Sequence, residues 1–519
     1  MLARTAIISS FCNMASRTKF GKHLTDQHRY RLSYNIGSPH RSGATMTPSS
    51  RVQRNRVIRA VLRLSMGAAL GTASVGQAIA KDAEAGPLYK ALGAPDRLTI
   101  KLTLRSRVEA IDGQFRPPPR PADDRLWSLR TTLFAEYKQG PLRIGGEVID
   151  ARGYGENVKS SVGTGEVDAV ELAQGYVALD VNNRFGKGST AALTAGRFAL
   201  NIGSSRLVGR TDFPNTVNSF TGLNFEWSGA GKDHFIGFWT MPALKGPVDD
   251  RGVHHNAVNW DRESPELQFY GASFTKAKIT SSVSAEVYGY RLAERDSASI
   301  ATRNRRLSTV GTRLLRSSGK RIDFEAEGAY QFGKIRATVA ASDHADLKVS
   351  AYFAHAEIGK ELALPWAPRL SLHGDIASGD SGTPGHYGRF DSLFGARRTD
   401  FGPTALYGPI GRANLVSPGV RIEVKPWPKL DGFVMARGLW LEHTADSFSS
   451  TGVRDRSGRS GSYAGAQFEG RVRYWVIPKE VRVELGSAYL VKALFLQAAP
   501  NAPATGNTRY VYFDVSGQF

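Results

Sequence analysis

Arginines that alternate with apolar residues are the side chains of this chain best suited to a chemical task. Arg105, Arg107 and Glu109 occupy every second position of one segment, and Arg471 and Arg473 repeat that spacing near the other end of the sequence. Guanidinium groups at a period of two lie on one face of a β-strand, where they offer paired hydrogen-bond donors to anionic groups. The spacing therefore favours binding or passage of anions, with the neighbouring acids holding the arginines extended.

Segments that resemble catalytic or metal-binding motifs are less specific. Residues Gly379–Gly382 spell the Gly-Asp-Ser-Gly of a serine-protease nucleophile, but Thr383 replaces the glycine expected next. The segment Gly229–Lys232 lacks the frame of a phosphate-binding loop, and the adjacent pair His254-His255 lacks metal-ligand spacing. The sequence therefore predicts no catalytic residue, no metal ligand, no cofactor and no enzymatic activity.

The segments that carry the arginines alternate between apolar and polar residues over their whole length. In Leu98–Ala110 the even positions are apolar or small and the odd positions are mostly Thr, Lys, Arg or Glu. This period of two predicts β-strands with one apolar and one charged face, and their length of about 10–13 residues suits a tilted strand that crosses a bilayer. We predict an all-β fold in which residues 96–519 form a transmembrane antiparallel β-barrel with apolar side chains toward lipid. The same alternation recurs in residues 127–138, 321–330, 466–476 and 481–492.

The connections and the last strand agree with a barrel. Gln139–Pro141 is a tight turn, whereas Gly379–Pro418, Phe448–Tyr463 and Gln497–Thr508 are long, and outer-membrane barrels have short turns at one end and long loops at the other. The final alternating strand ends on Phe519, which we predict to be an assembly signal. The alternative, an edge strand of a soluble β-sandwich, would expose a flat apolar edge that invites aggregation.

The N-terminal region has the composition of a targeting segment. Residues 1–80 contain twelve Lys or Arg and a single acid, Asp26, which is about half of the formal net charge of +21. Five arginines precede an apolar run at 64–76, and Ala78-Ile79-Ala80 supplies a cleavage site, which is the order of a secretory signal peptide. The protein is thus expected to reach the cell outer membrane through the periplasm. The predicted divisions are an over-extended or disordered leader in 1–45, a cleaved signal peptide in 46–80, a periplasmic lead-in in 81–95 and the barrel in 96–519.

Several groups of residues, taken in their order along the chain, resemble one known family. The segment Leu193–Trp227 places arginines and glycines between two apolar-aromatic runs. The groups are Arg105-x-Arg107-x-Glu109, Arg130 with Glu136, Glu147-x-x-Asp150-x-Arg152, Glu171 with Tyr176, Gly196-Arg197-Phe198, Gly203, Arg206-Leu207, Asp212, Asn215, Phe220-x-Gly222 and Ala377–Asp380. Together they resemble the alginate export family of outer-membrane β-barrel porins.

The resemblance implies a monomeric barrel of about eighteen strands whose arginine-lined lumen passes an anionic polysaccharide, such as an alginate-like polyuronate or another acidic saccharide. Phe198 and Thr221 depart from the family pattern, so a general or small-anion uptake porin stays open, and an outer-membrane hydrolase is a more remote alternative. Besides the anion, the expected partners are outer-membrane lipid and the outer-membrane assembly machinery. Nucleic acid is not expected, because the basic residues alternate along strands.

The predicted residues of the lumen come from two sources: charged residues at every second position of the predicted strands, and the groups that resemble the family. We expect Arg197, with Arg105, Arg107, Arg130 and the pair Arg471 and Arg473, to form the constriction that selects anions. The full set of predicted pore-lining residues is Arg105, Arg107, Glu109, Arg130, Glu136, Glu147, Asp150, Arg152, Arg197, Arg206, Asp212, Arg471 and Arg473.

Overall fold

The computed structural model describes residues 89, 91–93, 96–298, 300–317 and 322–519. The predicted leader and signal peptide lie outside the described residues, as does most of the predicted lead-in. Among the described residues, no helix has the length and apolar character needed to span a membrane.

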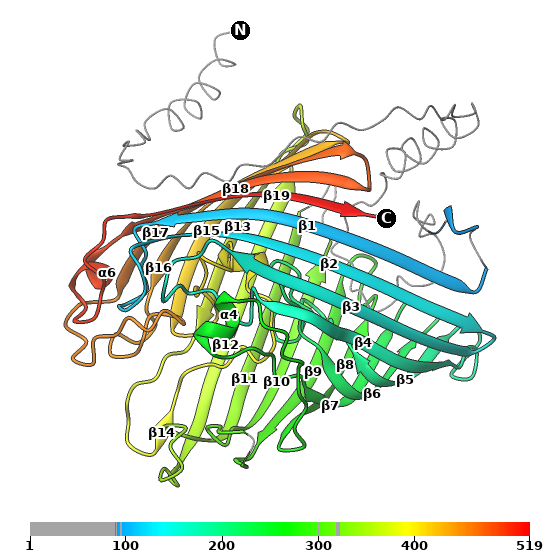
Figure 1. The fold of residues 1–519 in the computed structure, drawn as a ribbon, viewed down its shortest axis with the longest axis horizontal. Coiled ribbons are helices and arrows are strands. Elements are labelled where there is room, and N and C mark those ends of the chain that lie inside the picture. Colours follow the sequence, from blue (N-terminus) through cyan, green and yellow to red (C-terminus); the bar gives the residue numbers. More distant parts are fainter. Residues whose placement is uncertain (1–88, 90, 94–95, 299, 318–321) are drawn as a thin grey trace, which may run out of the picture. The chain divides into compact units, whose positions relative to one another are not determined.

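Antiparallel strands form one closed barrel (Figure 1). Each wall strand pairs with the next along the chain, and β19 pairs with β1. One further strand, β14 (His386–Tyr387), has two residues and lies parallel to β12, while β13 pairs directly with β15. Of the nineteen strands, eighteen therefore make up the wall, as expected. They are β1 (Leu98–Asp112), β2 (Asp123–Gln139), β3 (Leu142–Tyr154), β4 (Asp168–Asp180), β5 (Thr190–Phe198), β6 (Phe220–Ser228), β7 (His234–Pro242), β8 (Leu267–Lys276), β9 (Ser284–Glu294), β10 (Arg306–Arg316), β11 (Asp323–Arg336), β12 (Asp346–Glu361), β13 (Arg369–Ala377), β15 (Leu415–Trp427), β16 (Leu430–Trp440), β17 (Tyr463–Ile477), β18 (Val481–Lys492) and β19 (Thr508–Gln518).

Short and long connections alternate around the barrel, so its two ends differ. The short turns include 140–141, 428–429 and 478–480. The longest connections are 199–219, 243–266, 378–414 and 441–462, and they leave from the opposite end. The described residues of the long connections include three short helices: α4 (Asp250–His254), α5 (Arg398–Phe401) and α6 (Leu494–Ala498).

The alternation of side chains decides which residues face the lumen. On β1, Leu104 and Val108 are 42% and 53% exposed on the outer face, whereas Arg105, Arg107 and Glu109 are buried. Apolar residues are exposed in the same way along the other strands. This outward apolar surface is the one that a lipid environment would cover, and the charged residues are left to fill the interior.

Two long connections fold into the lumen. The β5–β6 loop (residues 199–219) and the β13–β15 loop (residues 378–414) meet at a parallel bridge between Val208 and Phe394. Apolar residues of the β5–β6 loop pack in a buried cluster with Phe220, Phe269 and other wall residues. Residues of the β13–β15 loop, Tyr407 among them, belong to a second buried cluster with the opposite wall. The lumen thus has an apolar core of its own, which holds both loops in place.

Candidate functional site

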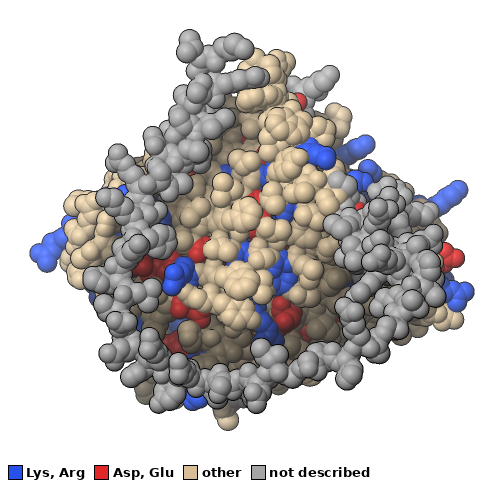
Figure 2. Space-filling model, turned by 45° about the horizontal axis from the view of Figure 1, so that its top comes forward, with Lys and Arg blue, Asp and Glu red and all other residues tan. Residues whose placement is uncertain are grey.

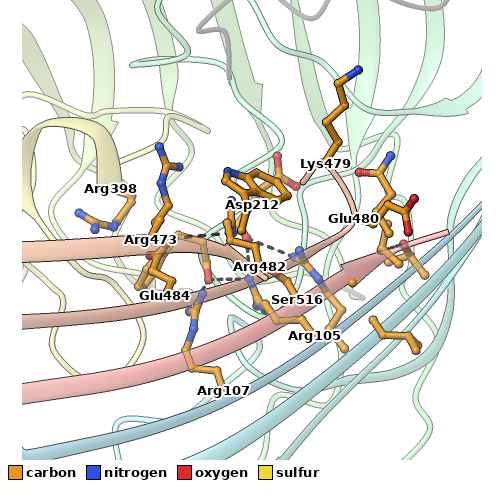
Figure 3. A pocket seen from close by; sticks show the side chains of 18 of the residues that line it. Arg105, Arg107, Asp212, Arg398, Arg473, Lys479, Glu480, Arg482, Glu484 and Ser516 are labelled. Atoms are coloured by element: carbon orange, nitrogen blue, oxygen red, sulfur yellow. Dashed lines mark hydrogen bonds and ion pairs between the residues drawn. The ribbon is translucent and has the colours of Figure 1, made fainter. Parts of the chain in front are cut away.

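A cavity of about 410 Å³ occupies the short-turn end of the lumen. Its lining comes from β1, β2, β3, β17, β18 and β19, from the β17–β18 turn, and from the two inner loops (Figure 3). Basic side chains outnumber acidic ones, nine to four. They are Arg105, Arg107, Arg130, Arg210, Arg398, Arg471, Arg473, Lys479 and Arg482, against Glu147, Asp212, Glu480 and Glu484.

The first group of arginines is held by main-chain oxygens. Arg105 and Arg130 stand directly opposite each other on β1 and β2, so their like charges need acceptors. The Asp212 carbonyl accepts from Nη1 of Arg105 at 2.8 Å and from Nη1 of Arg130 at 3.2 Å. Arg105 Nη2 also donates to the Pro214 carbonyl at 2.7 Å and to Oδ1 of Asn215 at 3.0 Å. Carbonyl groups orient these guanidinium groups without cancelling their charge.

Phe213 lies between two further guanidinium groups. The Arg107 guanidinium lies 4.0 Å from the centre of the Phe213 ring, and that of Arg398 lies 4.8 Å from it. Arg107 also donates to the Phe213 carbonyl at 2.7 Å and forms an ion pair with Asp514 at 3.0 Å. Cation–π contacts of this kind are favourable when partly desolvated. They anchor the tip of the β5–β6 loop at the cavity.

On strands β16 and β17, which lie on the same side of the barrel as β1, two arginines share one carboxylate. Asp431 lies 2.8 Å from Arg473 and 3.8 Å from Arg471. On the adjacent strand, Arg482 lies 3.8 Å from Glu484, which also accepts a hydrogen bond from Tyr512 at 2.6 Å. Positive charge therefore remains in excess along this wall. Figure 2 shows basic and acidic side chains close together in a hollow on one face of the molecule.

Seven of the predicted pore residues line this cavity: Arg105, Arg107, Arg130, Glu147, Asp212, Arg471 and Arg473. Glu109 and Glu136 lie on the lumen side of the wall but are buried, and neither lines the cavity. Glu109 accepts a hydrogen bond from Tyr510 at 3.0 Å. Glu136 accepts from Tyr176 at 2.7 Å and pairs with Arg143 at 3.0 Å. These two acids hold other side chains rather than facing the open space.

The structure corrects the expected place of Arg197 and Arg206. Arg197 faces inward but lies outside the cavity lining, and its guanidinium pairs with Glu171 and Glu263, both at 2.6 Å. Arg206 pairs with Asp400 of α5 at 2.9 Å and with Glu327 of β11 at 2.8 Å, and it also contacts Glu325. Two or three carboxylates saturate each guanidinium, so Arg197 does not form the predicted constriction and Arg206 does not line the cavity as predicted. Both residues fasten loops to the wall.

Asp150 and Arg152 lie on the other face of the barrel. They pair in register with Thr131 and Leu129 on β2, on the same outer face as the exposed residue Leu133. The two side chains form an ion pair with each other at 2.9 Å and are each about one-third exposed. The resemblance of this group to the family does not show which face of the strand each residue occupies. Asp150 and Arg152 were therefore predicted to line the lumen together with Glu147.

Several charged residues of the cavity were not predicted to line the pore. Arg482 and Glu484 alternate with apolar residues on β18, so they show the same period of two as Arg105 and Arg107 on β1. Arg210 and Arg398 lie in the two inner loops, where no period shows which way a side chain points; Arg210 pairs with Glu147 at 2.6 Å, and Arg398 contacts Glu469 at 2.5 Å.

Comparison with known proteins gives a family and a fold. The family model described as "Alginate export" matches residues 96–509. The crystal structure of OccK3 (OpdO) from Pseudomonas aeruginosa is 13% identical and superposes with a TM-score of 0.51, covering 82% of this chain and 96% of that chain. The structure of OpdK with vanillate from the same organism gives 13% and 0.51, with coverage of 82% and 99%. That of the outer membrane protein opdK, also from Pseudomonas aeruginosa, gives 14% and 0.50, with coverage of 81% and 98%. No curated protein sequence matches. At such identities the likeness to solved structures shows the fold alone.

Proposed function

Because this chain belongs to the alginate export family and forms an outer-membrane channel, we propose that it passes acidic saccharides of the polyuronate class through its arginine-lined lumen. The observation that carries the proposal is the excess of basic over acidic side chains around the cavity. A carboxylate that enters meets guanidinium groups already oriented by main-chain carbonyls, such as those of Arg105 and Arg130. Weakly hydrated, planar donors of this kind bind carboxylates in paired fashion and release them again, because several similar partners compete.

A small-anion porin is the second candidate, and the inner loops favour it. Three main-chain hydrogen bonds join the two loops: Phe394 N to Leu207 O at 3.0 Å, Gly209 N to Phe394 O at 3.1 Å, and Ala396 N to Ser205 O at 2.8 Å. Phe394 also packs against Phe220 and Phe269 of the barrel wall, which holds the β13–β15 loop in place. A polymer would require the loops to separate, whereas a small carboxylate would not need so wide a path.

A reversible crosslink between the loops separates these candidates. A Cβ built on Gly209 would lie 3.7 Å from the Cβ of Ala396, within the usual spacing for a disulfide. The variant Gly209→Cys/Ala396→Cys, with the native Cys12 replaced by Ser, is reconstituted in liposomes, and the entry of uronate oligomers and of acetate is measured with and without reductant. A polyuronate channel should pass the oligomers only when reduced, and acetate in both states.

Other outcomes have distinct meanings. Passage of acetate but of no oligomer in either state would replace the polyuronate proposal by a small-anion porin. Equal permeability to acetate and to a cation of similar size would contradict both candidates. The single variants Gly209→Cys and Ala396→Cys control for effects of the substitutions themselves and should not respond to reductant.

A further inference from the structure

Two neighbouring strands bring two histidines and two carboxylates together in the lumen wall. His355 and Glu357 alternate on β12, and His373 and Asp375 alternate on β13. In the register of the pair, His355 lies opposite Asp375 and Glu357 lies opposite His373. None of the four residues lines the arginine cavity, so they form a separate group with its own chemistry.

Each imidazole ring of this group has one nitrogen already engaged. His355 Nδ1 donates to the Asp375 carboxylate at 2.7 Å, and both side chains are almost completely buried. His373 Nε2 shares a hydrogen bond of 2.8 Å with Ser371 Oγ. Histidines that bind metals are held in this way, because a hydrogen bond at one nitrogen fixes the ring and leaves the lone pair of the other nitrogen for the ion.

The second nitrogen of each imidazole ring has no close hydrogen-bond partner among the described residues. Nε2 of His355 is buried and has no hydrogen-bond partner among the described residues, which ordinarily costs free energy in a protein interior. Nδ1 of His373 lies 3.5 Å from Glu357 Oε2. A potential ligand atom from each of His355, Glu357 and His373 lies within 4.8 Å of the other two. Small side-chain rotations would therefore bring all three around one ion.

We propose that His355, His373 and Glu357 bind a divalent transition-metal ion of the zinc class, with Asp375 and Ser371 positioning the two rings. Two imidazole nitrogens and one carboxylate oxygen match the preference of Zn²⁺, Co²⁺ and Ni²⁺, and leave a coordination position open.

The surrounding charges argue for this class and against hard cations. Arg369 contacts the other oxygen of Glu357 at 2.5 Å, and Arg437 lies 4.0 Å from Asp375. These guanidinium groups offset the carboxylate charge that Ca²⁺ and Mg²⁺ require. Binding must therefore come chiefly from the neutral imidazoles, which coordinate transition metals.

The test uses the full-length protein, purified in detergent and freed of metal with a chelator. Zn²⁺ is titrated by calorimetry, and Co²⁺ binding is followed by its visible absorption. The wild type should bind Zn²⁺ at this site, and His355→Gln/His373→Gln should lose that binding together with the Co²⁺ absorption bands. Asp375→Asn should weaken binding about 10- to 100-fold, because it releases the His355 ring.

A matched control is the exposed-loop pair His254 and His255, whose rings lie 5.5 Å apart. The variant His254→Ala/His255→Ala should bind Zn²⁺ as the wild type does. Unchanged Zn²⁺ binding in the His355/His373 variant, or loss of binding in the control, would overturn the proposal. If the double variant does not fold, as judged by its heat-modifiable migration, His373→Asn is titrated instead and must show the same loss.

Discussion

The acceptors around a guanidinium decide whether it can serve a passing anion. Arg130 faces the cavity and donates to two carbonyl oxygens, those of Asp212 and Pro214. Arg206, by contrast, has carboxylates on both sides. Both residues are inward-facing arginines in family-like groups of the sequence, yet only the first keeps its charge available.

Reversal of the charge at Arg130 should reduce anion selectivity. We expect Arg130→Glu to lower the anion-to-cation permeability ratio roughly three- to tenfold at low salt, because the change acts across a narrow and poorly screened space. The ratio is read from the reversal potential in a salt gradient across a planar bilayer. Arg152→Glu, which makes the same change on the outer face, should leave the reversal potential where it was; a shift of equal size there would contradict the assigned orientation.

A buried acid gives the fold a pH dependence. Burial raises the pKa of Glu166, in the β3–β4 connection, to about 7. The folded state therefore holds this proton more tightly than the unfolded state does, and stability is lost as pH rises from about 4.5 through 7. Glu166→Gln should remove that loss, worth at most about 3 kcal/mol. The thermal midpoint of the variant should exceed that of the wild type at pH 8 and approach it at pH 4; an equal difference at both values would exclude this titration.

Sequence patterns predicted the direction of side chains better than their partners. The alternation on β1 put Arg105 and Arg107 on one face, and in the structure both are buried and line the cavity. Such parity is a local property of a strand. Nothing local shows that Glu263, far along the chain, pairs with Arg197. The predicted constriction therefore included a residue whose charge is already neutralised.

Among the elements, strands and loops differed in how far they could be predicted. Long alternating segments gave the wall, since each strand needs an apolar outer face whatever its neighbours are. The β5–β6 and β13–β15 loops carry no period, and their place in the lumen depends on contacts between distant residues, such as the ion pair of Arg206 with Asp400. The predicted long loop Gly379–Pro418 begins close to the observed connection but runs into β15, which starts at Leu415, and its inward fold was not foreseen.

Removal of Arg206 should loosen the inner loops. Arg206→Ala leaves Glu327 as a buried carboxylate with a hydrogen bond from Tyr288 but no cation, whereas Asp400 keeps its ion pair with Arg412. Loss of the cation from such a buried pair costs roughly 3–5 kcal/mol. We expect a lower thermal midpoint together with larger and more variable single-channel conductance. Arg295→Ala, which removes an exposed ion pair with Glu266, should change neither. A stable Arg206→Ala channel with wild-type conductance would show that the ion pairs of Arg206 are not needed to hold the inner loops.

The molecule as a whole is closed by its first and last strands, which lie side by side in Figure 1. Arg107 and Asp514 pair across this seam although they are 407 residues apart in the sequence. At its edge, Phe519 N donates to Leu102 O at 2.8 Å and Leu102 N donates to Phe519 O at 3.0 Å. The closed wall agrees with what the periodicity indicated, and the family agrees with the resemblance of the residue groups.

Loss of the final residue should impair closure of the barrel. Deletion of Phe519 removes both hydrogen bonds with Leu102, so less heat-modifiable protein should accumulate in the outer membrane. Gln518→Ala keeps the main chain and the terminal ring, and it should assemble as the wild type does. Equal amounts of folded barrel from the deletion variant would remove Phe519 from the assembly signal.

The pairing of β1 with β19 also has a consequence for incomplete copies of this protein. The barrel closes only when β1 pairs with β19. A chain that synthesis or proteolysis has cut short lacks β19, so the edges of β1 and β18 have no partner within the same molecule. Such a fragment cannot enclose an aqueous path, so an unfinished product would present unpaired strand edges and would not form an open leak through a closed ring.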